Sequence, residues 1–246
     1  TNVRCFELIG PLRSGLALYE TERLGLTPNE ATPYRRAFTE IETDEGFTGL
    51  TTGGSRAVAQ LGQEIVGEDP LCIEAIWDRL YTGTYTRYER LGDLSTLDLA
   101  LWDLAGKIRN EPVYRLLGGP CQPKVRAYAA MLGFSTEPKA AAQRSVEYIE
   151  KGFGAVKWYL PCNALDGDDG LRRNVALIKA VREAVGDDID IMVDWLLADP
   201  TANSLLYAIK LARKLEPYHP AWIEEPLNFD DLEAYVKLSR ATSIPL

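Results

Sequence analysis

Two adjacent glutamates end an apolar stretch in the last quarter of the sequence. In "PAWIEEPL" the apolar residues run directly into Glu224 and Glu225, and a proline follows. Two carboxylates at the tip of a buried strand repel each other and resist removal from water unless a cation or hydrogen bonds compensate. The simplest interpretation is a strand end whose acids face water, since charged side chains usually stay solvated. The alternative is a cation site, and the preceding strands bear on that choice.

Other apolar stretches also end in residues that can do chemistry. "FGAVKWYL" carries Lys157 and Tyr159, and "IDIMVDW" carries Asp194. Side chains alternate along a strand, so Lys157 and Tyr159 share a face. In parallel α/β architectures ligands bind beyond the carboxyl ends of the strands. Asp194 and Glu224 end consecutive predicted strands, and their oxygen ligands suit a hard divalent ion, with Mg²⁺ the best candidate.

The elements that must position these residues begin at about residue 125. There a strand–helix alternation predicts a parallel sheet covered by helices. The expected strands are "VRAYAAML", "FGAVKWYL", "IDIMVDW" and "AWIEEPL"; the expected helices are residues 137–151, "LRRNVALIKAVREAV", "TANSLLYAIKLARKLE" and "DDLEAYVKLSRAT", and "IPL" is read as the start of another strand.

A TIM-type (β/α) barrel fits this pattern better than a dinucleotide-binding sheet. No G-x-G-x-x-G follows the first strand, and no P-loop lysine motif occurs. Four complete units and the start of a fifth are present, whereas eight units close such a barrel. We therefore expect residues 123–246 to form only the first half of a barrel.

Residues 1–122 read as an α+β capping domain. Two strand patterns, "VRCFELIGPL" and "YRRAFTEIETDEGFTGL", predict an antiparallel sheet, with "TDEG" as a turn signal. The segment from about 14 to 33 has no clear period and is expected to be a lid that offers Tyr19 or Arg23 to a substrate. A helix is predicted over 93–108, with a leucine stripe and a capping box from Ser95 to Asp98.

Composition narrows the classes of function. The net charge of −9 argues against nucleic acid as a partner, and no stretch approaches the roughly 20 apolar residues that cross a bilayer. Four scattered cysteines and the absence of a signal pattern favour reduced thiols in the cytoplasm. The single histidine, His219, precedes a strand at the end away from the acids, which favours a structural role. We also expect a homo-oligomer.

Four segments resemble the enolase superfamily, in its mandelate racemase and muconate lactonising branch. In order they are "LDLALWDLAGKIRNEPVYRLLGG", "VKWYL", "IDIMVDW" and "WIEEPL". The resemblance implies a capping domain followed by a modified barrel, with Mg²⁺ held by acids that end the third, fourth and fifth barrel strands. Asp194 and Glu224 match the first two ligands, and Glu225 is then expected to support them. The third ligand would follow "SIPL", beyond Leu246.

Within that branch, the loop after "VKWYL" and its helix are most similar to acid-sugar dehydratases, including rhamnonate dehydratase-like members. The implied reaction is Mg²⁺-dependent abstraction of the proton α to the carboxylate of an aldonic or aldaric acid, which gives a 2-keto-3-deoxy acid. Alternatives are a racemase or epimerase of an α-substituted carboxylic acid, and a non-catalytic relative that binds a sugar acid.

The same resemblance makes Lys157 and Tyr159 the catalytic candidates. Members with Lys-x-Lys on this strand use the second lysine as the base, and Tyr159 occupies that place here. A phenol is a poor base at neutral pH unless a neighbour helps it. Lys157 is expected either to add positive charge beside the substrate carboxylate or to depress the pKa of Tyr159. Tyr159 thus has three candidate roles: proton transfer, substrate positioning or packing.

Overall fold

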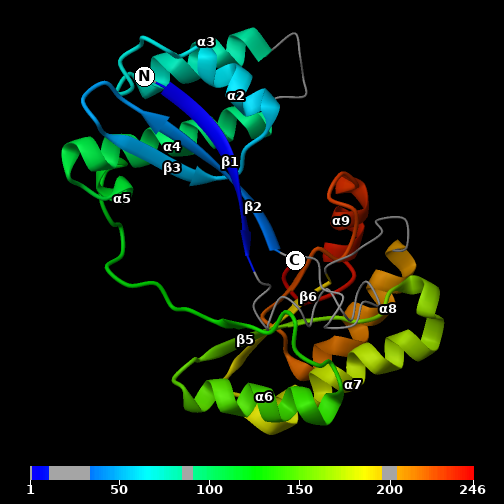
Figure 1. Ribbon diagram of the computed structural model, residues 1–246. Coiled ribbons are helices and arrows are strands. Elements are labelled where there is room, and N and C mark those ends of the chain that lie inside the picture. Colours follow the sequence, from blue (N-terminus) through cyan, green and yellow to red (C-terminus); the bar gives the residue numbers. More distant parts are fainter. Residues whose placement is uncertain (1, 11–33, 85–90, 196–203) are drawn as a thin grey trace. The chain divides into compact units, whose positions relative to one another are not determined.

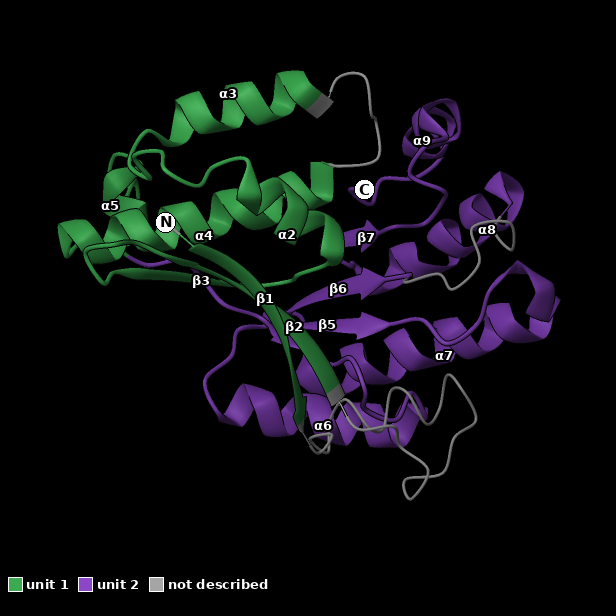
Figure 2. Ribbon diagram, turned by 45° about the horizontal axis from the view of Figure 1, so that its top comes forward, with its two compact units in different colours: residues 1–12, 32–123 green, residues 13–31, 124–246 purple. Residues whose placement is uncertain are grey.

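The computed structural model describes residues 2–10, 34–84, 91–195 and 204–246. These residues form two compact units, of which the first ends at Pro123 and the second begins at Lys124 (Figure 2). The predicted lid, with Tyr19 and Arg23, lies outside the described residues, so its role stays a prediction. Within the described ranges, no helix is long and apolar enough to cross a membrane.

The first unit contains an antiparallel sheet. Its strands are β1 (Asn2–Gly10), β2 (Tyr34–Glu42) and β3 (Thr48–Thr52), which lie in that order. The predicted turn "TDEG" joins β2 to β3, and Gly46 there has a φ of 85°, which glycine adopts without strain. Val3 and Ile41 lie on the face of the sheet that is buried against the helices of this unit.

Two helices, α2 (Arg56–Gln63) and α4 (Leu91–Arg109), cover that buried face. Two more, α3 (Ile73–Thr84) and α5 (Val113–Leu116), pack against α4. The predicted leucine stripe on α4 is confirmed, because Leu97, Leu101 and Leu104 are all buried. The predicted capping box is wrong. Ser95 lies inside the helix, and its hydroxyl donates to the carbonyl of Leu91 at 2.8 Å, a bond that serine makes within helices as well as at their ends.

The second unit contains the predicted parallel sheet with its intervening helices (Figure 1). The strands, which neighbour one another in chain order, are β4 (Ala129–Ala130), β5 (Ala155–Tyr159), β6 (Asp190–Asp194) and β7 (Trp222–Glu224). The helical segments are α6 (Pro138–Glu150), η1 (Ala164–Asp166), α7 (Gly167–Val185), α8 (Leu205–Leu215), η3 (Glu216–Tyr218) and α9 (Leu232–Ser239).

Three boundaries differ from the sequence-based expectation. The first strand is reduced to Ala129 and Ala130, and α7 begins at Gly167, inside the segment predicted as a loop. The final "IPL" is not a strand, although the amide of Ile223 donates to the carbonyl of Pro245 at 2.9 Å. Apolar periodicity marks the middle of an element well, but its ends depend on caps and on neighbouring strands.

Alternation along the strands gives the parallel sheet two different faces. The apolar face packs on the helices and forms the core with Val156, Trp158, Ile191, Val193 and Ile223. The intervening residues point to the opposite face. Lys157, Tyr159, Asp194 and Glu224 therefore share that second face, and the core packing on the first face holds them in register.

Arg182 of α7 ties together the amino-terminal side of the sheet. Its guanidinium donates to the carbonyls of Gly186 (2.6 Å), Ile189 (2.7 Å), Tyr218 (3.0 Å) and His219 (3.2 Å). These carbonyls lie just before β6 and β7, so one buried side chain fixes the entry of both strands. His219 itself has a φ of 46° and an exposed side chain, in keeping with a structural place in the chain.

We expect Arg182→Met to lower the free energy of unfolding by about 2 to 4 kcal/mol, because four carbonyls would lose their donor. Urea denaturation followed by circular dichroism measures this change. Lys179→Met on the same helix is the matched control, since its ammonium pairs with Glu183 at the surface, at 3.8 Å. Equal stability of the two variants would contradict the role given to Arg182.

Candidate active site at the carboxyl ends of β5, β6 and β7

The predicted chemistry-bearing residues lie in two adjacent layers of the sheet. Tyr159 pairs with Asp194, and Asp194 pairs with Glu224, so these three side chains form one row at the carboxyl ends of the strands. One layer earlier, Lys157 pairs with Met192, which in turn pairs with Trp222. Residues two apart on a strand point to the same face, so both layers share one face of the sheet. The residues between them, such as Trp158 and Val193, point to the other face and form the apolar core.

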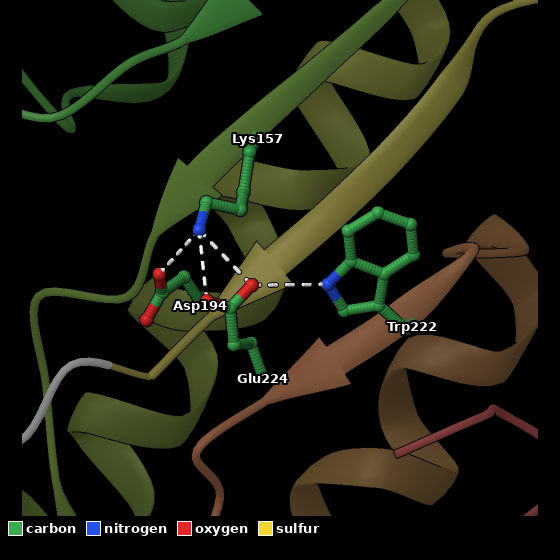
Figure 3. A network of polar contacts seen from close by, with 4 residues as sticks. All are labelled: Lys157, Asp194, Trp222 and Glu224. Atoms are coloured by element: carbon green, nitrogen blue, oxygen red, sulfur yellow. Dashed lines mark hydrogen bonds and ion pairs between the residues drawn. The ribbon is translucent and has the colours of Figure 1, made fainter. Parts of the chain in front are cut away.

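Lys157 joins the two acids (Figure 3). Its Nζ lies 2.9 Å from Asp194 Oδ2 and 3.0 Å from each carboxylate oxygen of Glu224. The side chains of Lys157 and Asp194 are buried, whereas that of Glu224 is 38% exposed. A single ammonium therefore compensates the two carboxylates whose proximity the sequence predicts.

Two tyrosine rings complete the surroundings of this ammonium. The Nζ of Lys157 lies 5.4 Å from the centre of the Tyr159 ring and 5.6 Å from the centre of the Tyr128 ring. Both distances are within the range of cation–π attraction. Tyr128 precedes β4 and was not expected from the sequence. Its position two residues before Ala130, the partner of Lys157, is the signal that could have identified it once the register was known.

Trp222 is a second residue that the sequence analysis missed. Its indole Nε1–H donates to Glu224 Oε2 at 3.1 Å (Figure 3). The available signal was the spacing of two residues on one strand, which places both side chains on the same face.

Burial is the largest single influence on the pKa of Asp194, Glu224, Lys157 and Tyr159. It raises the pKa of Asp194, and the hydrogen bond from Lys157 offsets only part of that effect. Burial also acts to raise the pKa of Glu224, but the bonds from Lys157 and Trp222 outweigh it and leave the pKa lowered. For Lys157, burial favours a lower pKa, yet the bonds to both acids raise it above the ordinary lysine value. Lys157 is therefore an ammonium at neutral pH.

The pKa of Tyr159 departs from the sequence-based expectation. Burial raises it, and the charge of Lys157 lowers it by less, so the net pKa of Tyr159 is raised. Lys157 thus lowers the pKa of Tyr159 as predicted, but its effect is smaller than that of burial. Like an ordinary tyrosine, Tyr159 is a protonated phenol at neutral pH, so it can donate a hydrogen bond or a proton but is not available as a base.

The donor set fits a hard cation. Asp194 Oδ1 is buried and has no hydrogen-bond partner among the described residues, which leaves a carboxylate oxygen available. Glu224 lies beside it on the neighbouring strand, and such oxygens are the ligands Mg²⁺ prefers. Asp194 and Glu224 would hold the ion. Across the ranges that the structure describes, no cluster of three or more His, Cys, Asp or Glu side chains is arranged to bind a metal, so these two acids alone carry the assignment.

Glu225 lies apart from this cluster. Its side chain is exposed, its φ is 50°, and within the described chain it makes no hydrogen bond to either acid. Its negative charge nevertheless contributes to the raised pKa of Asp194. The predicted supporting role of Glu225 stays a prediction, whereas Trp222 does hydrogen-bond a predicted ligand directly.

Comparisons with known proteins identify the family of this chain. Residues 32–118 match the family "Mandelate racemase / muconate lactonizing enzyme, N-terminal domain", and residues 139–246 match "Enolase C-terminal domain-like". The chain therefore belongs to the enolase superfamily, in its mandelate racemase and muconate lactonising branch.

Similar proteins include several sugar-acid dehydratases. The chain is 34% identical to the D-galactonate dehydratase of Xanthomonas euvesicatoria pv. vesicatoria (strain 85-10), over 90% of this chain and 59% of that protein. It is 34% identical to the D-gluconate dehydratase of Thermoproteus tenax, over 76% of this chain and 38% of that protein. The chain thus spans less than two thirds of the length of these relatives.

A solved structure with the same fold is the 3,6-anhydro-D-galactonate cycloisomerase from Zobellia galactanivorans. It superimposes with a TM-score of 0.77 at 26% identity, over 100% of this chain and 63% of that chain. The predicted fold class, an α+β unit followed by part of a (β/α) barrel, is confirmed by this similarity and by the two family matches.

The ion-pair cluster predicts a pH-dependent stability. In buffer that contains a chelator, we expect Lys157→Met to be less stable than the parent by about 3 kcal/mol at neutral pH, because two carboxylates lose their shared cation. Without Lys157, the folded-state pKa values of Asp194 and Glu224 rise above their unfolded values, so the folded variant binds more protons and gains stability as the pH falls. In the parent, the lowered pKa of Glu224 contributes stability that is lost toward acid.

The difference in the free energy of unfolding between the parent and Lys157→Met should therefore narrow as the pH falls from about 6 to 4. Thermal unfolding at several pH values measures it. Lys237→Met, which removes an ion pair with Glu233 at the surface, is the control and should show a small gap at every pH. If the difference for Lys157→Met stays constant over this range, the pKa values of Asp194 and Glu224 do not depend on Lys157.

Proposed function

We propose that the protein dehydrates an aldonic or aldaric acid with the help of Mg²⁺ and releases a 2-keto-3-deoxy acid. The observation that carries this proposal is the cluster of Lys157, Asp194 and Glu224 at the carboxyl edge of the parallel sheet. The names of the related D-galactonate and D-gluconate dehydratases support the substrate class. Enolase superfamily members generally use Mg²⁺, which supports the choice of cation.

The chemistry follows from the weak acidity of the proton α to a carboxylate. As that proton leaves, negative charge spreads onto the carboxylate, and nearby positive charge stabilises it. A bound Mg²⁺ ion would act as a Lewis acid at the substrate carboxylate. Lys157 would add a fixed second positive charge beside it. Asp194 and Glu224 have two tasks in this arrangement, since they would hold the cation and they also orient the ammonium of Lys157.

Tyr159 is proposed as the proton donor in the second half of the reaction. Its phenol is protonated at neutral pH, as in an ordinary tyrosine, and burial does not lower its pKa. The bond between C3 and its hydroxyl oxygen breaks as a C2–C3 double bond forms, and the hydroxyl takes the phenolic proton and leaves as water. The remaining enol gains a proton at C3 from solvent and loses its C2 hydroxyl proton to become the 2-keto-3-deoxy acid, and solvent reprotonates the tyrosinate. The proposal assigns no residue as the group that accepts the α-proton. Donation by Tyr159 and abstraction by another group differ from the two opposed bases that a racemase uses.

The remaining expectations concern the context of this reaction. A small sugar acid is the proposed partner, and a homo-oligomer in the cytoplasm remains a prediction. Two functions compete with dehydration: racemisation or epimerisation of an α-substituted acid, and binding of a sugar acid without catalysis. The next experiment distinguishes them.

Incubation of the full-length protein with a panel of aldonic and aldaric acids and Mg²⁺ is expected to yield a 2-keto-3-deoxy product from at least one of them, detected with a carbonyl reagent. Activity should disappear with a chelator and return with Mg²⁺. Exchange of the α-proton with solvent and inversion of configuration, without a keto product, would instead identify a racemase or epimerase. Binding without either reaction would identify a non-catalytic protein.

Tyr159→Phe removes only the phenolic hydroxyl and therefore tests its role. If Tyr159 donates the proton to the leaving group, kcat for dehydration should fall by about 10² to 10⁴ while exchange of the α-proton survives. If Tyr159 is the base, exchange itself should fall by the same factor. If it only positions substrate, KM should rise and kcat should persist.

Tyr148→Phe provides the control for this measurement. Tyr148 lies on α6 among the residues packed against the apolar core, so the loss of its hydroxyl should leave both rates unchanged.

A further inference from the structure

Glu224 is the less protected of the two proposed cation ligands. Its side chain is 38% exposed, whereas that of Asp194 is 5% exposed. A glutamate has more rotatable bonds than an aspartate, so an exposed one samples more conformations and loses more entropy when it binds a cation. A ligand in this position needs a second fixed contact to be held ready.

Trp222 provides such a contact. Its indole donates to Oε2 of Glu224 at 3.1 Å, while Lys157 bonds both carboxylate oxygens at 3.0 Å. Oε2 therefore accepts from two donors and Oε1 from one. The geometry leaves Oε1 as the oxygen with more free acceptor capacity, which fixes the edge of the carboxylate that can reach a cation.

The ring of Trp222 is itself held by Tyr128. The two ring centres lie 6.2 Å apart with an interplanar angle of 79°, an edge-to-face contact. The same Tyr128 ring lies 5.6 Å from the Nζ of Lys157. An aromatic pair in the layer beneath the acids thus contacts both side chains that bond Glu224.

Trp222 is not part of the apolar core cluster. It is half-buried and lies on the polar face of the sheet, opposite the core cluster that includes its neighbour Ile223. Its indole donates to Glu224 and its ring packs edge-to-face on Tyr128. A residue that served only for packing would be expected on the other face.

We propose that Trp222 is a positioning residue that orients Glu224 for the cation, with the Tyr128 ring holding the indole in place. This inference rests on the proposed function, because it takes Glu224 as a cation ligand. Partners that orient a metal ligand typically change metal affinity by about 10- to 100-fold when they are removed. The effect should therefore be visible in binding as well as in catalysis.

The first test measures Mg²⁺ binding to the full-length protein by calorimetry. Trp222→Phe is expected to raise the Kd at least about 10-fold, because the indole donor is lost and an aromatic ring is retained. Trp158→Phe is the matched control: Trp158 also donates its indole N–H, to Ser145 Oγ at 2.9 Å, but on the apolar face. A Kd for Trp222→Phe within about twofold of the parent value would overturn the proposal.

Two variants at Tyr128 test the proposal independently, in case Trp222→Phe does not fold. Tyr128→Phe keeps the ring and should leave the Kd unchanged. Tyr128→Leu removes the edge-to-face partner while retaining Trp222, and it should weaken binding by about 3- to 10-fold. Equal Kd values for these two variants would contradict the role of the ring.

The second test needs no metal. The chain has five tryptophans, so ¹⁵N-indole labelling gives a small set of N–H signals, and the Trp222 signal is the one missing from Trp222→Phe. In chelated protein, Glu224→Gln should shift this signal upfield, because a charged acceptor is replaced by a neutral one. An unmoved signal would refute the positioning contact.

The two readouts distinguish this inference from the function on which it rests. If the parent protein binds no Mg²⁺ but the Trp222 signal responds to Glu224→Gln, then the proposed function fails and the positioning contact stands. If Mg²⁺ binds and the signal does not respond, the function stands and the inference about Trp222 is wrong.

Discussion

The ammonium of Lys157 between the carboxylates of Asp194 and Glu224 is the interaction on which the site depends. Two carboxylates on neighbouring strands repel each other, and burial makes each harder to ionise. A lysine one layer below, with a flexible stem long enough to reach both, supplies the compensating charge without leaving its own strand. The arrangement keeps the acids together at an edge where a divalent cation and an anionic substrate would meet, and it keeps Lys157 charged because both acids raise its pKa.

Core packing on the opposite face makes this geometry possible. A shift of one residue in the register would exchange the two faces of a strand and bury Lys157 among apolar side chains. The apolar residues of β5, β6 and β7, with Trp158 at their centre, exclude that shift. Arg182 fixes the entry of β6 and β7 from the other end. The residues that stabilise the second unit are therefore the reason that the reactive side chains converge.

The raised pKa of Tyr159 constrains the chemistry further. In a Lys-x-Lys pair, the second lysine can act as a base when its neighbour lowers its pKa. A buried tyrosine beside the same first lysine remains protonated, since burial outweighs the favourable charge. In the proposed dehydration the replacement would change the group from an acceptor to a donor of protons, which the loss of a hydroxyl group requires. A protonated Tyr159 is thus consistent with the proposed dehydration and does not supply one of two opposed bases.

The sequence by itself determined the fold class, the parallel order of the strands and the identity of the residues at their carboxyl ends, because hydrophobic alternation and strand ends are local properties. It could also indicate that Lys157 and Tyr159 share a face. Only the tertiary structure decided that Lys157 bridges both acids, that Tyr128 and Trp222 support them, and that burial outweighs the charge on Tyr159. The bridge made by Lys157 joins residues 67 positions apart in the chain, and the pKa of Tyr159 depends on the exclusion of water, and neither is encoded in any short stretch of sequence.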